Sequence, residues 1–369
     1  MVAIMTKNKK LKIAFVSPKR YSFYPGDYME RGLGGTESML VLLSSALAKL
    51  GHDVEVFNCC YMPGVYKGVH WKPVHTFKNS EQYDACISVR LLETFDIFDI
   101  KSPIRAIWIH DDSLRGATES DKSGKVNLWI AVSETQKGFI ERTEQIPSKN
   151  WFVTRNAYDE ELYSRKVTKV RGQVVYCSAP DRGLEYLLKY WGEIKRRVPF
   201  ANLHVTGSFA LWGNADEENN RFFENLYKLD SSLKDVYFHK RLKKGDLAKL
   251  QSESELMLYP ATFDEMYCIS ALECMSVGTP VISTARAAML ERISSGRNGF
   301  LIEGHPKDAN YQDEFISRTV KLMESPELLN QLAINATNDT TDLDFLNLAK
   351  EWESKFTAQL HSQSERGQE

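Results

Sequence analysis

Short apolar runs typical of strands alternate with amphipathic stretches typical of helices along the whole chain, and this alternation constrains the fold most. The stretch "KIAFVSP" at residues 12–18 reads as a buried strand. A glycine loop follows, and apolar residues at positions 39, 40, 43, 47 and 50 then mark one helical face. Gly51 ends that helix before the next strand, "DVEVFNC". The pattern predicts a parallel sheet covered by helices on both faces.

The same pattern starts a second time after the charged stretch 164–172. "QVVYCSAP" again reads as a strand, and the helix that follows carries Leu184, Leu187, Leu188 and Trp191 at helical spacing. Further strands are expected at 83–89, 105–112, 128–133 and 151–156, and in the second half at 202–208, 235–241, 255–260, 279–284 and 299–303. A chain of 369 residues exceeds one ordinary core.

These patterns predict an α/β protein of two Rossmann-like, doubly wound parallel-sheet domains facing an interdomain cleft. The expected domains are residues 1–168 and 169–344, and the last helix, at 345–362, is expected to pack back on the first domain. Ligands of such sheets bind at the carboxyl ends of the strands, so we expect the site in the cleft.

Charge and cysteine usage narrow the classes of partner. A net charge of −2 and a pI near 6.5 give no overall basic field, so nucleic acid is not an expected partner. No apolar run reaches the roughly 18 residues that span a bilayer. The six cysteines show no pair at zinc or redox spacing and read as reduced thiols. These features predict a cytoplasmic protein, with peripheral contact at a membrane left open.

Two glutamates eight positions apart, Glu265 and Glu273, flank the start of an expected helix. If the stretch between them were helical, they would lie about 12 Å apart on one face, which is too far for a paired acid and base. The backbone amides of Met266, Tyr267, Cys268 and Ile269 are expected to be unpaired at the helix start, where an anion is stabilised.

Two carboxylates with a phosphate-binding site between them form the arrangement that a nucleotide-diphosphate sugar requires. The alternative is structural: Glu265 would cap the helix or complement its dipole, and Glu273 would be a solvated helix residue.

The stretch "FDEMYCISALECMSVGTPVIS" at residues 263–283 resembles the Glu-x7-Glu signature of the retaining family 4 glycosyltransferases, which have the GT-B fold. Other pieces follow in the family's order: "GGTE", "IWIHDD", "IAVSE", "VTRNAYD", "RGLEYLL" and "SGRNGFLIEG". The resemblance covers roughly residues 11 to 305, and the family also folds its last helix back onto its first domain.

The resemblance implies that Glu265 contacts the donor sugar and Glu273 the ribose. Gly34 and Gly35 would line the cleft from the first domain, where missing side chains allow close approach. His110 matches the histidine that contacts the donor sugar near the reacting carbon; its alternative is a surface histidine at a strand end. Asp111 and Asp112 are adjacent, and a structural or acceptor-side role is expected for them rather than metal binding.

Arg182 stands where the family commonly has the lysine that neutralises the leaving pyrophosphate, and arginine suits phosphate because its planar fork binds oxygens in pairs. Two departures stand out. The family's Gly-Arg pair is absent from the shorter loop "YCSAPDRG", and "ARAAMLER" replaces the Gly-Gly-hydrophobic-Pro-Glu loop. Arg241 or Lys240 could compensate for the missing basic residue or flank the base; the alternative is a solvated cluster.

The sequence therefore predicts a retaining, metal-independent glycosyltransferase. The donor is a UDP or GDP type sugar used as co-substrate, and the acceptor is a hydroxyl of a glycan, polysaccharide or glycolipid. The alternatives are a non-catalytic sugar-nucleotide-binding partner of a glycan assembly complex and a GT-B nucleotide-sugar epimerase. A dinucleotide dehydrogenase is disfavoured because no strand is followed by Gly-x-Gly-x-x-Gly.

Overall fold

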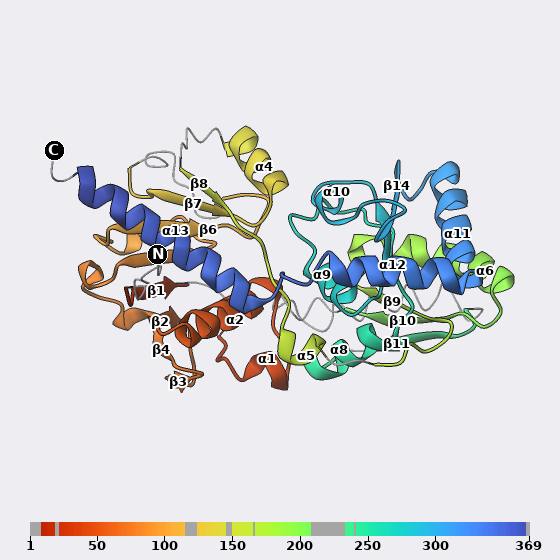
Figure 1. Ribbon diagram of the computed structural model, residues 1–369, viewed down its shortest axis with the longest axis horizontal. Coiled ribbons are helices and arrows are strands. Elements are labelled where there is room, and N and C mark those ends of the chain that lie inside the picture. Colours follow the sequence, from red (N-terminus) through yellow and green to blue (C-terminus); the bar gives the residue numbers. More distant parts are fainter. Residues whose placement is uncertain are drawn as a thin grey trace, which may run out of the picture. The chain divides into compact units, whose positions relative to one another are not determined.

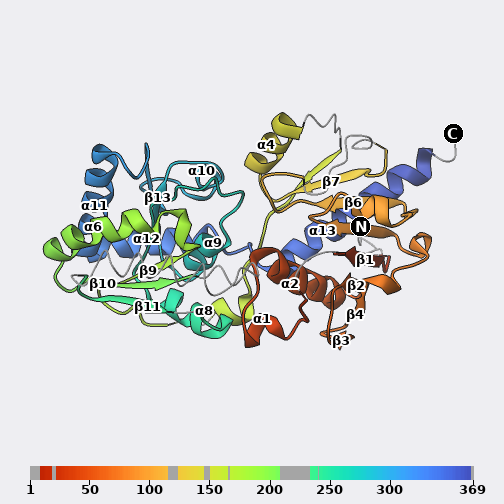
Figure 2. The same ribbon diagram turned by 180° about the vertical axis from the view of Figure 1, so that it is seen from behind.

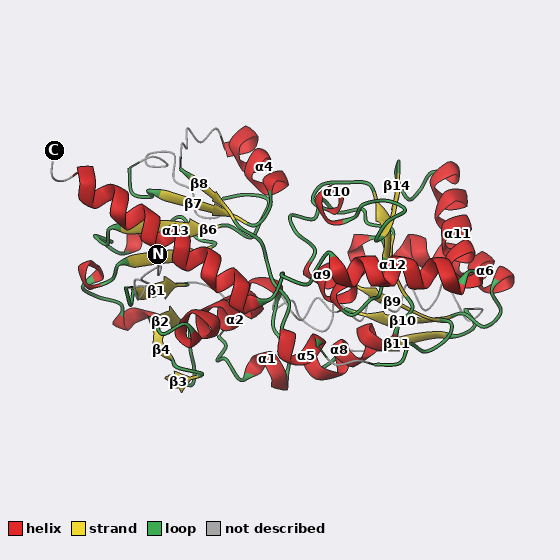
Figure 3. Cartoon of the chain, in the orientation of Figure 1, coloured by secondary structure: helices red, strands yellow, loops and turns green. Residues whose placement is uncertain are grey.

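The computed structural model describes residues 9–18, 22–114, 124–144, 150–164, 167–207, 233–239 and 241–366. The chain divides into two compact units. The first comprises residues 1–25, 39–155 and 345–369, and the second comprises residues 26–38 and 156–344. Each unit is built around its own sheet, with helices packed beside it (Figure 3).

The first unit contains an eight-stranded sheet in the order β3-β4-β2-β1-β5-β6-β7-β8. All pairings are parallel except that of β3 with β4. Its strands are β1 (Lys12–Val16), β2 (Asp53–Asn58), β3 (Gly64–Tyr66), β4 (Val69–Pro73), β5 (Ala85–Val89), β6 (Ile104–Trp108), β7 (Leu128–Ala131) and β8 (Trp151–Val153). Its helices are α2 (Gly35–Lys49), α3 (Thr94–Ile97), α4 (Glu134–Glu144) and α13 (Phe345–Arg366), with the 3₁₀ turns η1 (Val74–Thr76) and η2 (Ser80–Gln82).

Helix α13 crosses one face of this sheet (Figure 1). Its Trp352 is fully buried, with its ring centroid 4.9 Å from that of Trp108 and 6.1 Å from that of Phe15. Side chains alternate along a strand, so the neighbours of Phe15 in sequence, Ala14 and Val16, belong to the core on the other face. Burial of these aromatic rings fastens the end of the chain to the first sheet.

The second unit contains a six-stranded, all-parallel sheet in the order β11-β10-β9-β12-β13-β14. Its strands are β9 (Gln173–Cys177), β10 (Asn202–Thr206), β11 (Val236–His239), β12 (Leu256–Tyr259), β13 (Val281–Thr284) and β14 (Gly299–Ile302). Its helices are α1 (Asp27–Glu30), α5 (Glu160–Tyr163), α6 (Leu184–Arg197), α8 (Lys244–Glu253), α9 (Ile269–Ser276), α10 (Met289–Arg292), α11 (Ala309–Glu324) and α12 (Pro326–Asn338), with the 3₁₀ turn η3 (Pro180–Arg182).

Helices cover both faces of the second sheet. Helix α12 lies over the face seen in Figure 1, and α6 lies over the opposite face, seen in Figure 2. The apolar side of α6 is fully buried, as its helical spacing predicts: Leu184, Leu187 and Trp191 are each inaccessible to solvent. The strands β9, β12 and β13 are buried along their whole length, which explains why they read as continuous apolar runs, whereas Tyr237 on the edge strand β11 is 49% exposed.

The predicted fold class is confirmed: the chain forms two parallel-sheet α/β units, and every strand expected above overlaps an observed strand. The antiparallel β3–β4 hairpin was not foreseen. The boundaries between the two units also differ from the boundary at residues 168–169 that the sequence pattern suggests. The second unit begins at residue 156 instead of 169, and it includes residues 26–38, which carry the glycine loop.

Candidate active site

The strand order of the second sheet reverses between β9 and β12, because the chain runs outward from β9 through β10 to β11 and then returns to β12. The carboxyl ends of two such strands diverge and leave a crevice where ligands of open α/β sheets bind. Arg182 follows β9, and Glu265 follows β12. Two residues selected from the sequence therefore lie at this switch point.

Arg182 and Glu265 contact each other directly. Arg182 Nη1 lies 2.9 Å from Glu265 Oε1, and the guanidinium carbon lies 3.9 Å from the centre of the Phe263 ring. The phenol of Tyr259, at the end of β12, donates a 2.6 Å hydrogen bond to the same glutamate oxygen. Glu265 itself is only 7% exposed. A fixed cation and a fixed carboxylate thus lie in contact at the switch point.

Burial and charge set the protonation of this group. Burial, with a further contribution from Glu265, holds the pKa of Tyr259 well above its usual value, so the phenol stays protonated and donates. Burial alone would lower the pKa of Arg182, but Glu265, Tyr259 and Asp181 together outweigh it and raise that pKa. Arg182 is therefore a permanent cation and Tyr259 a permanent donor at neutral pH.

The helix that follows starts later than expected. Helix α9 begins at Ile269, and Cys268 is its N-cap residue in the left-handed region, with φ +62°. The amides without a carbonyl partner inside the helix are therefore those of its first turn, which starts at Ile269. The prediction for residues 266–269 is correct only for Ile269. Met266 and Tyr267 precede the helix and are buried. The positive helix end still lies directly after Glu265 in the chain.

Glu273 lies four residues into α9 and is 4% exposed. Its Oε1 contacts the ammonium of Lys244, and its Oε2 lies 3.4 Å from Gln251 Nε2. Glu273 is thus a buried, paired carboxylate, and the solvated-residue alternative is wrong. The capping alternative for Glu265 is wrong as well, because α9 has no side-chain cap and Glu265 bonds Arg182 and Tyr259 instead.

The glycine loop belongs to the same unit. A methyl group added at Gly35 would lie 3.0 Å from Ile269 Cδ1, at the start of α9, so a side chain there would push on that helix. Gly34 is buried, and its carbonyl accepts from Ser38 N. The guanidinium of Arg241 donates to the carbonyl of Gly32, so this arginine is not part of a solvated cluster. Lys240 lies outside the described residues.

His110 follows β6 in the first unit. Its ring lies 4.3 Å from the ring of Trp108, and its Nε2 is buried without a hydrogen-bond partner in the described part of the chain. Burial, with a smaller effect of the Arg90 cation, holds the pKa of His110 well below its usual value, so the imidazole is neutral. A plain surface histidine does not fit this environment.

Asp111, next in the chain, accepts a 2.8 Å bond from Arg90 Nε, and its carbonyl accepts one from Gln136 Nε2. Arg90 follows β5 and adopts φ +71°. This ion pair fixes the loop after β6, which agrees with a structural role for Asp111. Among the described residues, no group of three or more His, Cys, Asp or Glu side chains could hold a metal ion, and no helix is long and apolar enough to cross a membrane.

Sequence reasoning missed several polar residues around the two glutamates: Tyr259, Lys244, Gln251 and Tyr163. Tyr259 could have been found, since it is the last residue of a strand whose carboxyl end was already selected. The others come from α8 and α5, and no spacing in the sequence links these helices to α9.

Residues 175–339 match the family model described as glycosyl transferases group 1. A D-inositol 3-phosphate glycosyltransferase of Paenarthrobacter aurescens (strain TC1) is 31% identical over 149 residues, which are 40% of this chain and 32% of that protein. The chain thus spans about a third of the length of this curated relative.

Solved structures resemble nearly the whole chain. A sucrose-phosphate synthase from Thermosynechococcus elongatus superimposes with a TM-score of 0.72 at 17% identity, over 96% of this chain and 100% of that one. Anabaena HepE in complex with UDP and glucose superimposes with a TM-score of 0.65 at 15% identity, over 94% and 100%. These likenesses define the fold, which is the GT-B fold of glycosyltransferases. The family-model match and the similarity to the curated relative each cover less than half of the chain.

Proposed function

We propose that this chain is a retaining, metal-independent glycosyltransferase that moves a sugar from a nucleotide-diphosphate donor to an acceptor hydroxyl. One observation carries the proposal: Arg182 and Glu265 meet at the switch point of the second sheet, and α9 begins four residues after Glu265 in the chain. The crevice therefore offers a cation and a helix end for a diphosphate, and a carboxylate for sugar hydroxyls, within one short span.

In this reaction the bond between the anomeric carbon and the phosphate oxygen breaks, and the diphosphate leaves with the electron pair. The acceptor oxygen bonds the anomeric carbon on the same face, and its proton passes to the departing phosphate oxygen. Arg182 and the first turn of α9 would stabilise the negative charge that develops on the diphosphate. No metal ion is needed for this role, because the protein itself supplies the positive charge.

Glu265 would hold the donor sugar. Arg182 and Tyr259 both bond Oε1, and Oε2 has no hydrogen-bond partner in the part of the chain that the structure describes, so Oε2 can accept from a sugar hydroxyl. His110, neutral because of its low pKa, would give or receive a hydrogen bond at the sugar without adding charge. Glu273 would receive the ribose hydroxyls.

The chemistry of the site indicates only the class of donor nucleotide and the class of acceptor. UDP is the first nucleotide to test, because the HepE structure that resembles this chain holds UDP. The acceptor is proposed to be a hydroxyl of a glycan, polysaccharide or glycolipid. We further propose a cytoplasmic location for the enzyme.

The first experiment screens UDP, GDP and ADP by thermal shift, because a ligand that binds the folded state raises its melting temperature. The matching nucleotide sugars are then incubated with a panel of sugar and glycolipid acceptors, and NMR determines the anomeric configuration of the product. Transfer with retained configuration in the presence of a chelator is expected. Product formed without acceptor would indicate an epimerase, and binding without turnover on any acceptor would indicate a silent binding partner.

A further inference from the structure

A buried ion pair joins the first residue of α8 to the middle of α9. The Lys244 ammonium contacts Glu273 Oε1, with side chains only 12% and 5% exposed. A lysine at the first position of a helix faces the positive end of the helix dipole, which disfavours a cation there. The position of the Lys244 ammonium is therefore explained by its contact with Glu273. Neither the helix dipole nor solvation of the ammonium explains it.

The carboxylate is held from its other side as well. Tyr163 Oη donates a 2.6 Å hydrogen bond to Gln251 Oε1, which turns the amide nitrogen of Gln251 toward Glu273 Oε2 at 3.4 Å. Gln251 is fully buried and Tyr163 is 3% exposed. Both glutamate oxygens therefore have a protein partner, with the Tyr163 phenol close to the carboxylate as well, and the carboxylate cannot rotate freely about its last bond.

Two aromatic rings flank the ammonium. Lys244 Nζ lies 5.5 Å from the ring centre of Tyr163 and 5.9 Å from that of Tyr28, which α1 contributes. Rings at this distance attract a cation and restrict where it can move. The other charged groups near this cluster are Asp159 and Glu161, which lie around Tyr28.

We infer that Lys244 is a positioning residue that orients Glu273 for the ribose hydroxyls of the donor. The inference rests on the proposed function, in which Glu273 holds the ribose. A carboxylate has about four lone-pair directions. The contacts with Lys244 and Gln251 use two of them and the nearby Tyr163 can use a third, so at least one direction remains for a ribose hydroxyl.

The test compares the affinities for ribonucleotides and 2′-deoxyribonucleotides. The ratio of these two affinities changes only if the substituted group orients the contact with the ribose. Binding of UDP, GDP and ADP and of their 2′-deoxy counterparts is measured by calorimetry for wild type, Lys244→Met and Lys244→Arg. A hydrogen bond to a charged group contributes about tenfold or more in affinity. Wild type should therefore prefer the ribonucleotide about tenfold, Lys244→Met should lose most of that preference, and Lys244→Arg should keep much of it.

The same helix offers a matched control. Lys249, whose side chain is 70% exposed, lies 3.8 Å from Glu253, and Lys249→Met should keep the wild-type ratio. If Lys244→Met does not fold, Lys244→Ala, which also lacks a hydrogen-bond donor, takes its place. In kinetics the Lys244 variants should raise the donor KM more than they lower kcat.

The outcomes separate the two proposals. A wild-type ratio in a folded Lys244→Met or Lys244→Ala variant overturns the inference and leaves the proposed function intact. Equal binding of ribo- and deoxyribonucleotides by the wild type also overturns it. Failure of the wild type to bind any of the nucleotides instead overturns the proposed function.

Discussion

Arg182 and Tyr259 bond the same oxygen of Glu265, at 2.9 Å and 2.6 Å. Oε1 is thereby fixed by a charged and a neutral donor, and the orientation of the whole carboxylate is set before any ligand arrives. A site that is organised in advance loses little free energy to reorientation when charge develops. The roles proposed for these three residues can be tested one at a time.

Replacing either member of the Arg182–Glu265 pair with alanine should lower kcat/KM for sugar transfer by about 100-fold or more, near the effect of losing one preorganised electrostatic contact. Arg182→Ala should act mainly on kcat, because the diphosphate gains charge as it leaves. Initial rates with a nucleotide sugar and an acceptor measure both constants.

A surface pair provides the control for these substitutions. Arg196 bonds Glu193 at the exposed end of α6, with its side chain 71% accessible, and Arg196→Ala should leave the rates unchanged. Near-normal turnover of Arg182→Ala or Glu265→Ala would show that these residues do not have the proposed roles.

Tyr259→Phe removes one hydrogen bond to Glu265 and leaves the buried ring in place. We expect kcat/KM to fall about tenfold, the usual contribution of a hydrogen bond to a charged group. Tyr311→Phe is the matched control, since its buried phenol bonds Thr284 at 2.8 Å on the same sheet. Tyr311→Phe should lower stability slightly and not change the rate; an equal loss of rate in both variants would argue against a specific role for Tyr259.

The sequence predicted the parts of the site that lie along the chain, and missed those that only folding brings together. Glu265 could be selected from its place after an apolar strand and before a helix, and Arg182 from the resemblance to the glycosyltransferase family. Their direct contact could not be predicted, since it depends on β12 lying beside β9. The partners of Glu273 come from separate helices, whose packing no local pattern encodes.

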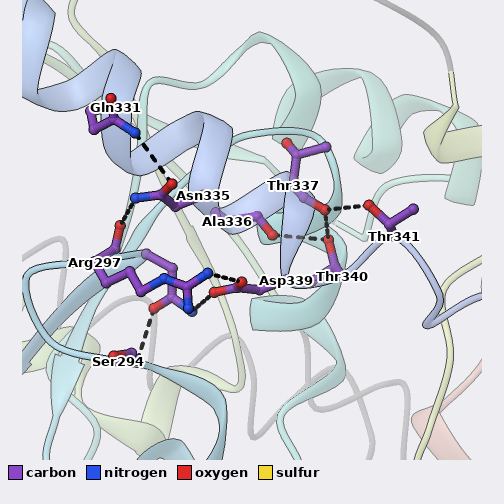
Figure 4. Close-up of polar contacts among 10 residues, drawn as sticks. Ser294, Arg297, Gln331, Asn335, Ala336, Thr337, Asp339, Thr340 and Thr341 are labelled. Carbon is purple, nitrogen blue, oxygen red and sulfur yellow. Dashed lines mark hydrogen bonds and ion pairs between the residues drawn. The ribbon is translucent and has the colours of Figure 1, made fainter.

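A network around Asn298 should stabilise the second unit. Asn298 Nδ2 donates to Asp339 Oδ2 at 2.8 Å, and its Oδ1 accepts from Ser294 N at 2.8 Å. Figure 4 shows the neighbouring contact of Arg297 with Asp339 and that of Asn335 with the Arg297 carbonyl. Asn298 is only 3% exposed, and Asn298→Ala removes both of these hydrogen bonds.

The expected cost of Asn298→Ala is about 2 kcal/mol in the free energy of unfolding, the scale of losing buried hydrogen bonds. Urea denaturation measures this quantity. Gln331→Ala, which removes one exposed contact at 3.2 Å from Asn335, should cost less than about 0.5 kcal/mol. Equal effects of the two substitutions would contradict a stabilising role for the buried network.

Acidification should destabilise the protein through histidines that folding keeps neutral. Burial, and next the neighbouring His239, lowers the pKa of His204 to about 4, and burial lowers that of His52 despite Glu353. An unfolded histidine titrates near 6.5, so below that pH the unfolded state binds more protons than the folded state. This part of the stability is complete above about pH 6.5 and is lost as the pH falls toward about 4. His204→Gln should therefore flatten the decline of the urea midpoint between pH 7 and pH 4.5, whereas the exposed control His70→Gln should not. An unchanged slope in His204→Gln would rule out this histidine as a source of the acid sensitivity.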